Sequence, residues 1–177
     1  MTKLVKPASE SEIHIRQVVE SDLQLLFEFQ KEPEANDIAA FPARDRDAFM
    51  THWTKIIGDE TVVAMTVVVC DCVAGNVGCW TQDCQRLVGY WIGKEYWGKG
   101  VATQMLSLFL RLVVDRPLYA YVARHNVASI RVLEKCGFVN CEKTTVDFGE
   151  SADGIEELVY VIHTTPVDPE STSHMST

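Results

Sequence analysis

The sequence predicts an α/β fold (α+β by layer): a mixed, mostly antiparallel sheet with a central parallel βαβ pair and helices on both faces. Three strand-like runs follow one another between residues 61 and 92, with short turns between them, and predict an antiparallel meander. The apolar period then changes to three and four residues from Val101, and a further strand follows at Leu118. Strand, helix and strand in this order form a parallel unit with a right-handed crossover.

The first part of the chain predicts one strand and two helices. Ile13–Val19 alternates apolar and polar residues, as a half-buried strand does, and Glu20-Ser21-Asp22 offers capping oxygens to a helix that begins with LQLLFEF. We expect a loop over Pro33–Pro42, where Pro, Asn and Asp interrupt the pattern. A second helix from about Arg44 to Ile57 has an apolar face.

The meander contains a strand that we expect to be covered on both faces. Its β-branched run, TVVAMTVVVC, is too continuous for a strand with one solvated side. Asp71-Cys72 predicts a tight turn, and Gly75 and Gly78 in the next strand mark a bulge or a close backbone approach. The three strands are Thr61–Cys70, Val73–Gln82 and Gln85–Ile92.

The second half of the chain predicts two more helices and a closing hairpin. The helix from Val101 ends before Pro117, and Leu118–Ala123 (LYAYVA) is the strand parallel to the one before it. A short helix over Asn126–Cys136 begins at an Asn cap and ends at Gly137. The hairpin consists of Phe138–Phe148 and Ile155–His163.

Length and composition indicate one domain. With 177 residues, 47% of them hydrophobic, we expect a flexible leader over 1–10, a domain over 11–164 and a disordered Pro, Ser and Thr-rich tail over 165–177. No apolar run approaches the roughly 18 residues of a membrane span, and the start lacks the apolar core of a signal peptide. We therefore expect a cytoplasmic protein that binds no membrane.

Charge and cysteine content exclude two classes of function. A net charge of -9 argues against a nucleic-acid binder and weakly favours an amine-bearing substrate. The six cysteines lack paired zinc knuckles, so we expect reduced structural thiols and no metal site.

The stretch GYWIGKEYWGKGVA, from Gly89 to Ala102, is the strongest candidate for a binding site. A strand that runs through a glycine-bearing turn into a helix exposes free backbone N–H groups at the positive end of the helix dipole. Such a cluster binds a diphosphate. Taken alone, the same glycines could equally serve only to make the turn.

A second block resolves this alternative. Asn126-x-x-Ser129 and Glu134-Lys135-Cys136-Gly137-Phe138 follow the turn, and together with Trp97–Ala102 they resemble the GNAT family of acetyl-CoA-dependent N-acetyltransferases, within it the RimJ/RimL-like branch. The family usually has Gln or Arg at the position of Trp97. The resemblance covers about Gln85 to Cys141 well.

The resemblance implies acetyl-CoA as co-substrate and a sheet whose central parallel strands splay at the cofactor cleft. The diphosphate would lie on backbone N–H groups of Gly98 to Ala102, and the pantetheine would pair with the backbone of Trp91 and Ile92. The implied cofactor-binding residues are Trp91, Ile92, Trp97, Gly98, Lys99, Gly100, Val101, Ala102, Thr103, Asn126, Ser129 and Lys135. Asn126 also fits the simpler role of a helix cap, and both roles are compatible.

The catalytic residues are less well defined. The backbone N–H of Ile92 would polarise the thioester carbonyl. Many relatives carry an acidic Tyr at the position of Leu133, so Ser129, one turn earlier, is our substitute, with local backbone bonding as its alternative role. The Glu that often precedes the GYW sequence is absent too. The candidate bases are then Tyr90, Asp83, Glu95 and His125.

The predicted function is transfer of an acetyl group from acetyl-CoA to a primary amine, by direct attack in a ternary complex. The acceptor is a small molecule or a protein N-terminus, and the oligomeric state stays open, a homodimer included. The alternative is a non-catalytic acyl-CoA-binding module that has lost its acid and base.

Overall fold

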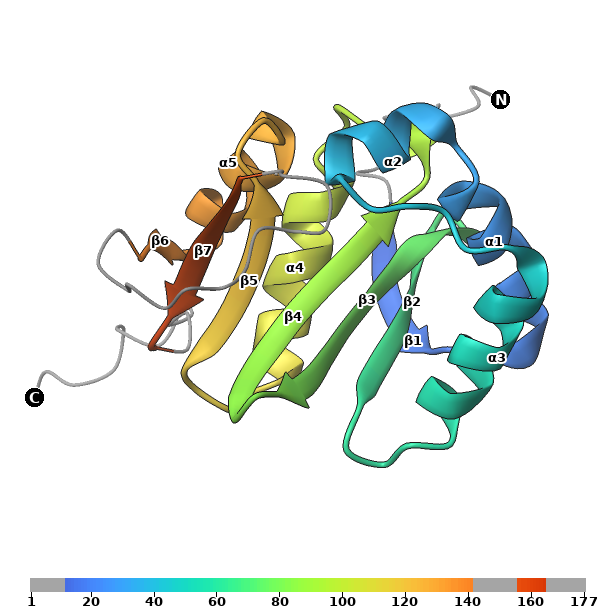
Figure 1. Cartoon of the computed structure of the whole chain (residues 1–177), viewed down its shortest axis with the longest axis horizontal. Coiled ribbons are helices and arrows are strands. Elements are labelled where there is room, and N and C mark those ends of the chain that lie inside the picture. The colour runs from blue at the N-terminus through green and yellow to red at the C-terminus, as the bar shows by residue number, and fades with distance from the viewer. Residues whose placement is uncertain (1–11, 142–155, 165–177) are drawn as a thin grey trace, which may run out of the picture.

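A computed structural model describes residues 12–141 and 156–164 of the chain (Figure 1). The predicted leader, the tail, and the loop of the closing hairpin with most of its first strand, Phe138–Phe148, lie outside these residues. The strands are β1 Ile13–Gln17, β2 Val63–Val69, β3 Cys72–Gln82, β4 Gln85–Ile92, β5 Leu118–Ala123, β6 Val139–Asn140 and β7 Glu157–Ile162. The helices are α1 Leu23–Gln30, α2 Pro33–Ala39, α3 Arg46–Ile57, α4 Val101–Leu112 and α5 Val127–Lys135, with 3-10 turns η1 Glu20–Asp22 and η2 Lys94–Tyr96.

The strands form one 7-stranded sheet in the order β1-β2-β3-β4-β5-β7-β6. β2, β3 and β4 are the predicted antiparallel meander, and β4 with β5 is the parallel pair. The neighbouring pairs β1/β2, β5/β7 and β6/β7 are antiparallel. The predicted fold class is therefore confirmed.

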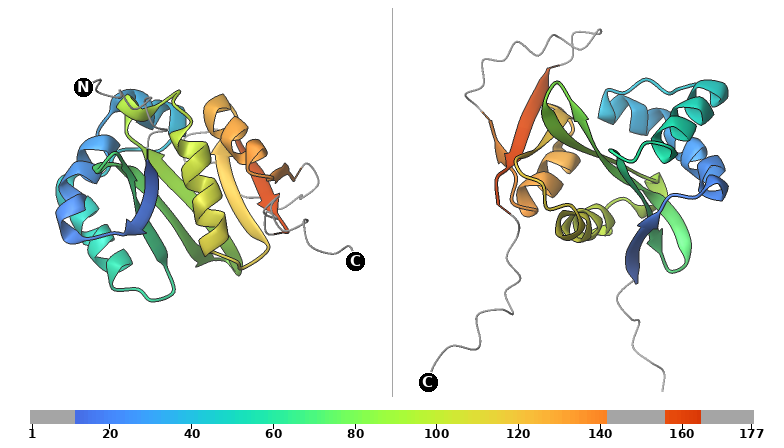
Figure 2. Two further views of the ribbon diagram at one scale, coloured as in Figure 1. Left: turned by 180° about the vertical axis from the view of Figure 1, so that it is seen from behind. Right: turned by 90° about the horizontal axis from the view of Figure 1, so that it is seen from below.

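Helices cover both faces of the sheet, as predicted (Figure 2). On one face α4 and α5 pack onto the larger core, where Met105, Leu106, Phe109 and Leu110 of α4 are fully buried. On the other face α1 and α3 form a smaller aromatic cluster around Phe49. The two cores place β4 between two apolar layers. None of the described helices is long and apolar enough to cross a membrane.

One predicted loop is wrong. Pro33–Ala39, which the sequence analysis assigned to a loop, is helix α2, with Pro33 in its first turn. Pro fits this position because the first N–H groups of a helix have no intrahelical partner. The helix ends at Ala40, whose φ of 52° breaks the helical backbone.

Gly75 borders a bulge in β3 and marks a close backbone approach, as predicted. The register between β2 and β3 shifts between Val67 and Val68, opposite this residue. A Cβ added at Gly75 would lie 2.1 Å from the carbonyl oxygen of Trp91 in β4, so only glycine allows this approach. Gly78 in the same strand lies at a regular register position.

The sequence analysis assigned Asp22 to helix capping, but its side chain has another role in the structure. It does not cap α1 through its side chain. Its buried carboxylate, 4% exposed, accepts two hydrogen bonds from Arg16 at 2.6 and 2.7 Å, one from Thr66 Oγ1 at 2.7 Å and one from the Val19 N–H at 3.1 Å. Burial raises the pKa of this carboxyl, but the hydrogen bonds outweigh burial and the net pKa is lowered. Asp22 therefore ties η1 to β1 and β2.

Replacing Asp22 by Ala should lower the free energy of unfolding by about 3 kcal/mol, because it leaves the buried Thr66 hydroxyl and the Arg16 guanidinium without their acceptor. The carboxylate form is stabilised by folding, so its contribution is present above about pH 4 and is lost as pH falls through the lower folded-state pKa. Urea unfolding at pH 7 and in the acid range measures both effects. Glu20→Ala, an exposed acid of the same turn, is the control and should change stability by less than about 0.5 kcal/mol.

Candidate functional site

A cavity of about 380 Å³ lies where β4 and β5 part. The two strands pair only at Arg86 with Leu118 and at Leu87 with Tyr119, although β4 continues to Ile92. The cavity is lined by α2 on one face of the sheet and by α4 and α5 on the other. It therefore passes through the sheet, which is the splayed opening that the sequence analysis expected.

The residues predicted to bind the cofactor gather around this cavity. All of them except Lys99 line it, and the three catalytic candidates Tyr90, Ile92 and Ser129 line it as well. Lys99 is exposed and lies outside the lining. Two segments that are well separated in sequence, the glycine turn at Gly98–Gly100 and the start of α5 at Asn126–Ser129, thus reach one site.

The α4 N-terminus offers free backbone donors to the cavity. Gly98 and Gly100 have φ values of 70° and 77°, which favour glycine, and they turn the chain from η2 into α4. The first intrahelical bond at this end runs from Gln104 N to Gly100 O, and no side chain caps the helix. In contrast, Asp45 caps α3 and Asn126 caps α5 through their side chains. The N–H groups at the start of α4 are therefore available to an anion.

Cations lie across the cavity from this turn. Arg131 and Lys135 are four residues apart on α5 and so share one face of the helix. Arg131 and Lys135 are both exposed, and both line the cavity. A phosphate group between α4 and α5 would meet helix N–H groups and two positive charges.

The end of β4 presents one backbone N–H to the opening. Gly93 N donates to Ala74 O of β3 at 2.9 Å, and because strand N–H groups alternate in direction, the N–H of Ile92 faces the other way, toward β5. The carbonyl oxygen of Ile92 accepts a hydrogen bond from Trp97 Nε1 at 2.8 Å. The Trp91 carbonyl faces Gly75 on β3, so the Ile92 N–H is the donor that remains for a ligand.

Tyr90 places a buried hydroxyl at the same cavity. Its Oη makes no hydrogen bond of good geometry among the described residues, although the Ser129 side chain is near enough that hydrogen bonding to it lowers the phenol pKa. Burial raises the pKa of Tyr90 to about 12, more than nearby Ser129 lowers it. The phenol therefore stays protonated at neutral pH and carries a proton, although burial makes it a weaker acid than an exposed tyrosine.

Asn126 is the helix cap that the sequence analysis allowed for. Its Oδ1 accepts from Ser129 N at 3.1 Å, and its side chain, 9% exposed, lines the cavity. Leu133, at the position where relatives carry an acidic Tyr, is buried in the larger core. The core thus holds an apolar residue at this position.

The other candidate bases lie away from the cavity. Asp83 belongs to the turn before β4, at the opposite end of that strand. Glu95 is exposed in η2, and His125 is exposed with its Nε2 donating to Asp37 O at 2.9 Å. None of these three lines the cavity, and no acidic side chain does among the described residues.

The sequence analysis missed several lining residues. Ala35, Ile38 and Ala39 come from α2, which was assigned to a loop. Arg131 was missed as well, and its spacing of four from Lys135 on a helix was the available signal.

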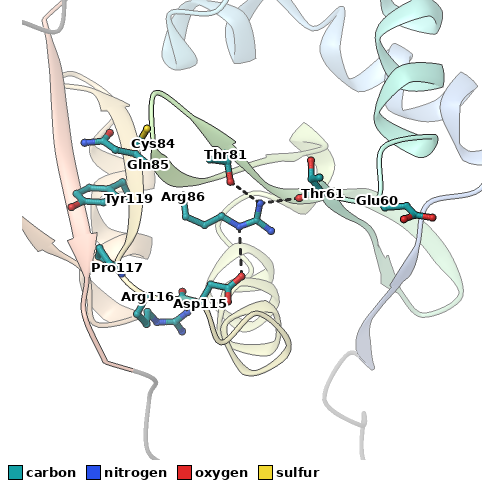
Figure 3. A pocket seen from close by; sticks show the side chains of 10 residues that line it. All are labelled: Glu60, Thr61, Thr81, Cys84, Gln85, Arg86, Asp115, Arg116, Pro117 and Tyr119. Atoms are coloured by element: carbon teal, nitrogen blue, oxygen red, sulfur yellow. Dashed lines mark hydrogen bonds and ion pairs between the residues drawn. The ribbon is translucent and has the colours of Figure 1, made fainter.

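A second cavity of about 540 Å³ lies at the other end of β4 (Figure 3). Its two arginines already have structural partners. Arg86 donates to Thr61 O at 2.9 Å and to Thr81 Oγ1 at 3.3 Å, and it pairs with Asp115 at 3.9 Å (Figure 3). Arg116 binds the last carbonyl oxygens of α4 and the chain after it. Ligands bind at the carboxyl ends of strands in such sheets, so we place the functional site at the first cavity.

The fold is shared with solved acetyltransferase structures. Spermidine N-acetyltransferase from Vibrio cholerae, solved with CoA and spermine, superimposes with a TM-score of 0.72 at 17% identity, covering 86% of this chain and 95% of that one. An acetyltransferase of the GNAT family from Bacillus anthracis gives 0.69 at 17% identity, covering 87% and 96%. An aminoglycoside acetyltransferase in complex with coenzyme A gives 0.66 at 16% identity, covering 86% and 95%.

One curated protein matches in sequence over part of its length. The phenylalanine–tRNA ligase beta subunit of Sodalis glossinidius is 34% identical over 86 residues, which is 49% of this chain but only 9% of that protein. The chain thus spans less than a tenth of that relative, and the match carries no argument about its activity.

The family profile described as "Acetyltransferase (GNAT) domain" matches residues 12–139, more than half of the chain. This range contains the glycine turn, the parting strands and the start of α5, on which the cavity is built. The protein belongs to the GNAT acetyltransferase family.

Proposed function

We propose that the protein is an N-acetyltransferase that uses acetyl-CoA and acetylates a primary amine by direct attack in a ternary complex. The observation that carries this proposal is the cavity through the sheet, which is lined by the start of α4, by Ile92 at the end of β4 and by Tyr90. A long anionic thioester and an amine can meet in it from opposite faces.

The residues present fit coenzyme A. The N–H groups at the start of α4 would bind the diphosphate, with Arg131 and Lys135 supplying positive charge. The pantetheine would follow the opening between β4 and β5 past Asn126. Structural neighbours solved with CoA support this assignment.

Acetyl transfer then needs a polarised carbonyl. The amine nitrogen attacks the thioester carbon, the C–S bond breaks, the thiolate takes up a proton and the amine loses one. The Ile92 N–H would stabilise the negative charge that develops on the carbonyl oxygen. A backbone donor is suited to this task because the strand fixes its direction in advance.

Tyr90 is the proposed proton donor to the thiolate. It is protonated at neutral pH, its buried hydroxyl makes no hydrogen bond of good geometry among the described residues, and the residue lines the cavity. Ser129 would pass or orient this proton rather than act alone. An alkyl amine has a pKa of about 10.4, so without a base at the cavity the enzyme would use the small unprotonated fraction.

The acceptor class is part of the proposal. The neighbours named as spermidine and aminoglycoside acetyltransferases support a small-molecule amine. The resemblance to the RimJ/RimL-like branch, which includes Ser129, supports a protein N-terminus as the second option.

Thiol release from acetyl-CoA tests the function directly. We expect free CoA to appear only when an amine is added, and the acetylated amine to appear in equal amount. If calorimetry shows acetyl-CoA binding but no amine or peptide releases thiol, the protein is the alternative, an acyl-CoA-binding module. The buried Leu133 at the usual position of the acid is the observation that favours this alternative.

Gly100→Asp should reduce acetyl-CoA affinity by about a hundredfold, because it places a carboxylate next to the diphosphate and strains a residue with φ of 77°. Gly100→Asn is the matched control, since Asn has the same size and tolerates this backbone region. Calorimetry should find it at least tenfold tighter than the Asp variant. Equal affinities of the two variants would contradict a phosphate at this turn.

Tyr90→Phe should lower kcat by about a hundredfold and leave acetyl-CoA affinity unchanged, because it removes only the proton donor. Tyr121→Phe is the control, since the Tyr121 hydroxyl binds Gln85 at 2.8 Å away from the cavity. An unchanged kcat in the Tyr90 variant would show that another group protonates the thiolate.

The rate of the native enzyme should rise from pH 6 to pH 10, because more amine becomes unprotonated while Tyr90, with a pKa of about 12, keeps its proton. The acid form is lost only as pH rises through about 12. A fall in kcat below pH 10, absent in the Tyr90 variant, would mean that the phenol titrates near its ordinary value of about 10.

A further inference from the structure

The side of the cavity away from α4 and α5 is apolar. It is formed by Ala35, Ile38 and Ala39 of α2 and by Trp91 of β4. The Trp91 indole is fixed by a hydrogen bond from Nε1 to Phe29 O at 3.0 Å, and Phe41 packs edge-on against it with ring centroids 6.1 Å apart. This wall offers contact area to a hydrocarbon body.

Negative charge is missing from the cavity lining. Among the described lining residues the charged ones are Arg131 and Lys135, both cations. The Arg44 guanidinium adds a positive charge over the Phe41 ring, 4.9 Å from its centroid. The overall charge of -9 is therefore located elsewhere on the chain.

Two of the three acids near this wall in sequence are already paired. Glu32 and Glu34, at the start of α2, form ion pairs with Lys94 at 3.3 and 2.5 Å. Asp37 is exposed on α2 and lies outside the lining. An ammonium group in the cavity would find no carboxylate on the described lining, and an unpaired charge is costly to desolvate.

We propose that the acceptor is a monoamine whose single amino group is carried on an uncharged, apolar body, and that the cavity selects against polyamines. This inference rests on the proposed function and specifies its substrate class. The reacting amine enters the opening as the free base, while its hydrocarbon body lies on the α2 wall. A polyamine would have to bring a second ammonium group against an apolar wall near Arg44.

Matched amines test the inference. Hexylamine and hexamethylenediamine share a six-carbon chain, which ends in a methyl group in hexylamine and carries a second ammonium group in the diamine. Phenethylamine is a further monoamine and spermidine a further polyamine for the comparison. We expect kcat/KM for hexylamine and phenethylamine to exceed that for hexamethylenediamine and spermidine by tenfold or more, measured by thiol release at saturating acetyl-CoA.

An added carboxylate should change this preference. Ile38→Glu places a negative charge on the α2 wall and should reduce the monoamine-to-diamine ratio of kcat/KM by at least tenfold, without changing acetyl-CoA affinity. Ile38→Leu keeps the wall apolar and should preserve the ratio. Ala39→Asp, one residue further along the same wall, provides the same test if the first variant does not fold.

The outcomes separate the two proposals. Equal or better use of hexamethylenediamine or spermidine by the native protein overturns the monoamine inference and leaves the acetyltransferase function in place. Thiol release with none of these amines overturns the monoamine inference, and it overturns the acetyltransferase function as well only if no peptide N-terminus releases thiol either. A ratio that Ile38→Glu and Ala39→Asp both leave unchanged, in folded variants that bind acetyl-CoA, overturns the assignment of the α2 wall as the acceptor surface.

Discussion

The early parting of β4 and β5 is the constraint on which the site depends. Two parallel strands that paired along their full length would satisfy each other's backbone groups and leave no opening. Here pairing stops after Leu87 and Tyr119, so the N–H of Ile92 is left without a strand partner at an apolar position between two cores. A ligand that supplies an acceptor there restores a hydrogen bond that the fold itself omits.

The separated strands stay ordered because each is held on its other side. β4 pairs with β3 over all eight residues, from Gln85 to Ile92, and β5 pairs with β7 from Leu118 to Ala123. Close packing also fixes the end of β4. A Cβ at Gly93 would lie 2.7 Å from the Phe29 ring, so the strand end contacts α1 directly. The reactive end of the site is thus built on rigid elements, whereas the α2 wall is contributed by a short helix.

Local patterns were enough to predict the sheet and to name most of the residues that line the cavity. The meander, the α4 periodicity and the capping Asn126 are properties of neighbouring residues, and the structure has them where the pattern indicates. The α2 helix was missed because proline has two opposite effects on a helix. It breaks a helix in the interior but is favourable in the first turn, and the sequence alone does not tell which of these positions Pro33 occupies. Asp22 was assigned to a helix cap because the sequence does not show its actual partners. Arg16 and Thr66 lie in β1 and β2, and only the fold brings them to η1. The buried state of the Tyr90 hydroxyl depends on α5 packing against β4, which no periodicity encodes.

The departure at Trp97 has a structural counterpart elsewhere in the site. A Gln or Arg at this position would direct a polar group toward the turn, whereas the Trp97 indole folds back and donates to the carbonyl of Ile92. This hydrogen bond satisfies the carbonyl oxygen of Ile92, which points away from β3 at the end of the strand. The N–H of Ile92 is then the backbone group of this residue that is left facing the opening. The turn itself then contributes only main-chain donors. In the proposed complex, Arg131 and Lys135 on α5, a helix that only the fold brings next to the turn, would supply the positive charge beside the diphosphate.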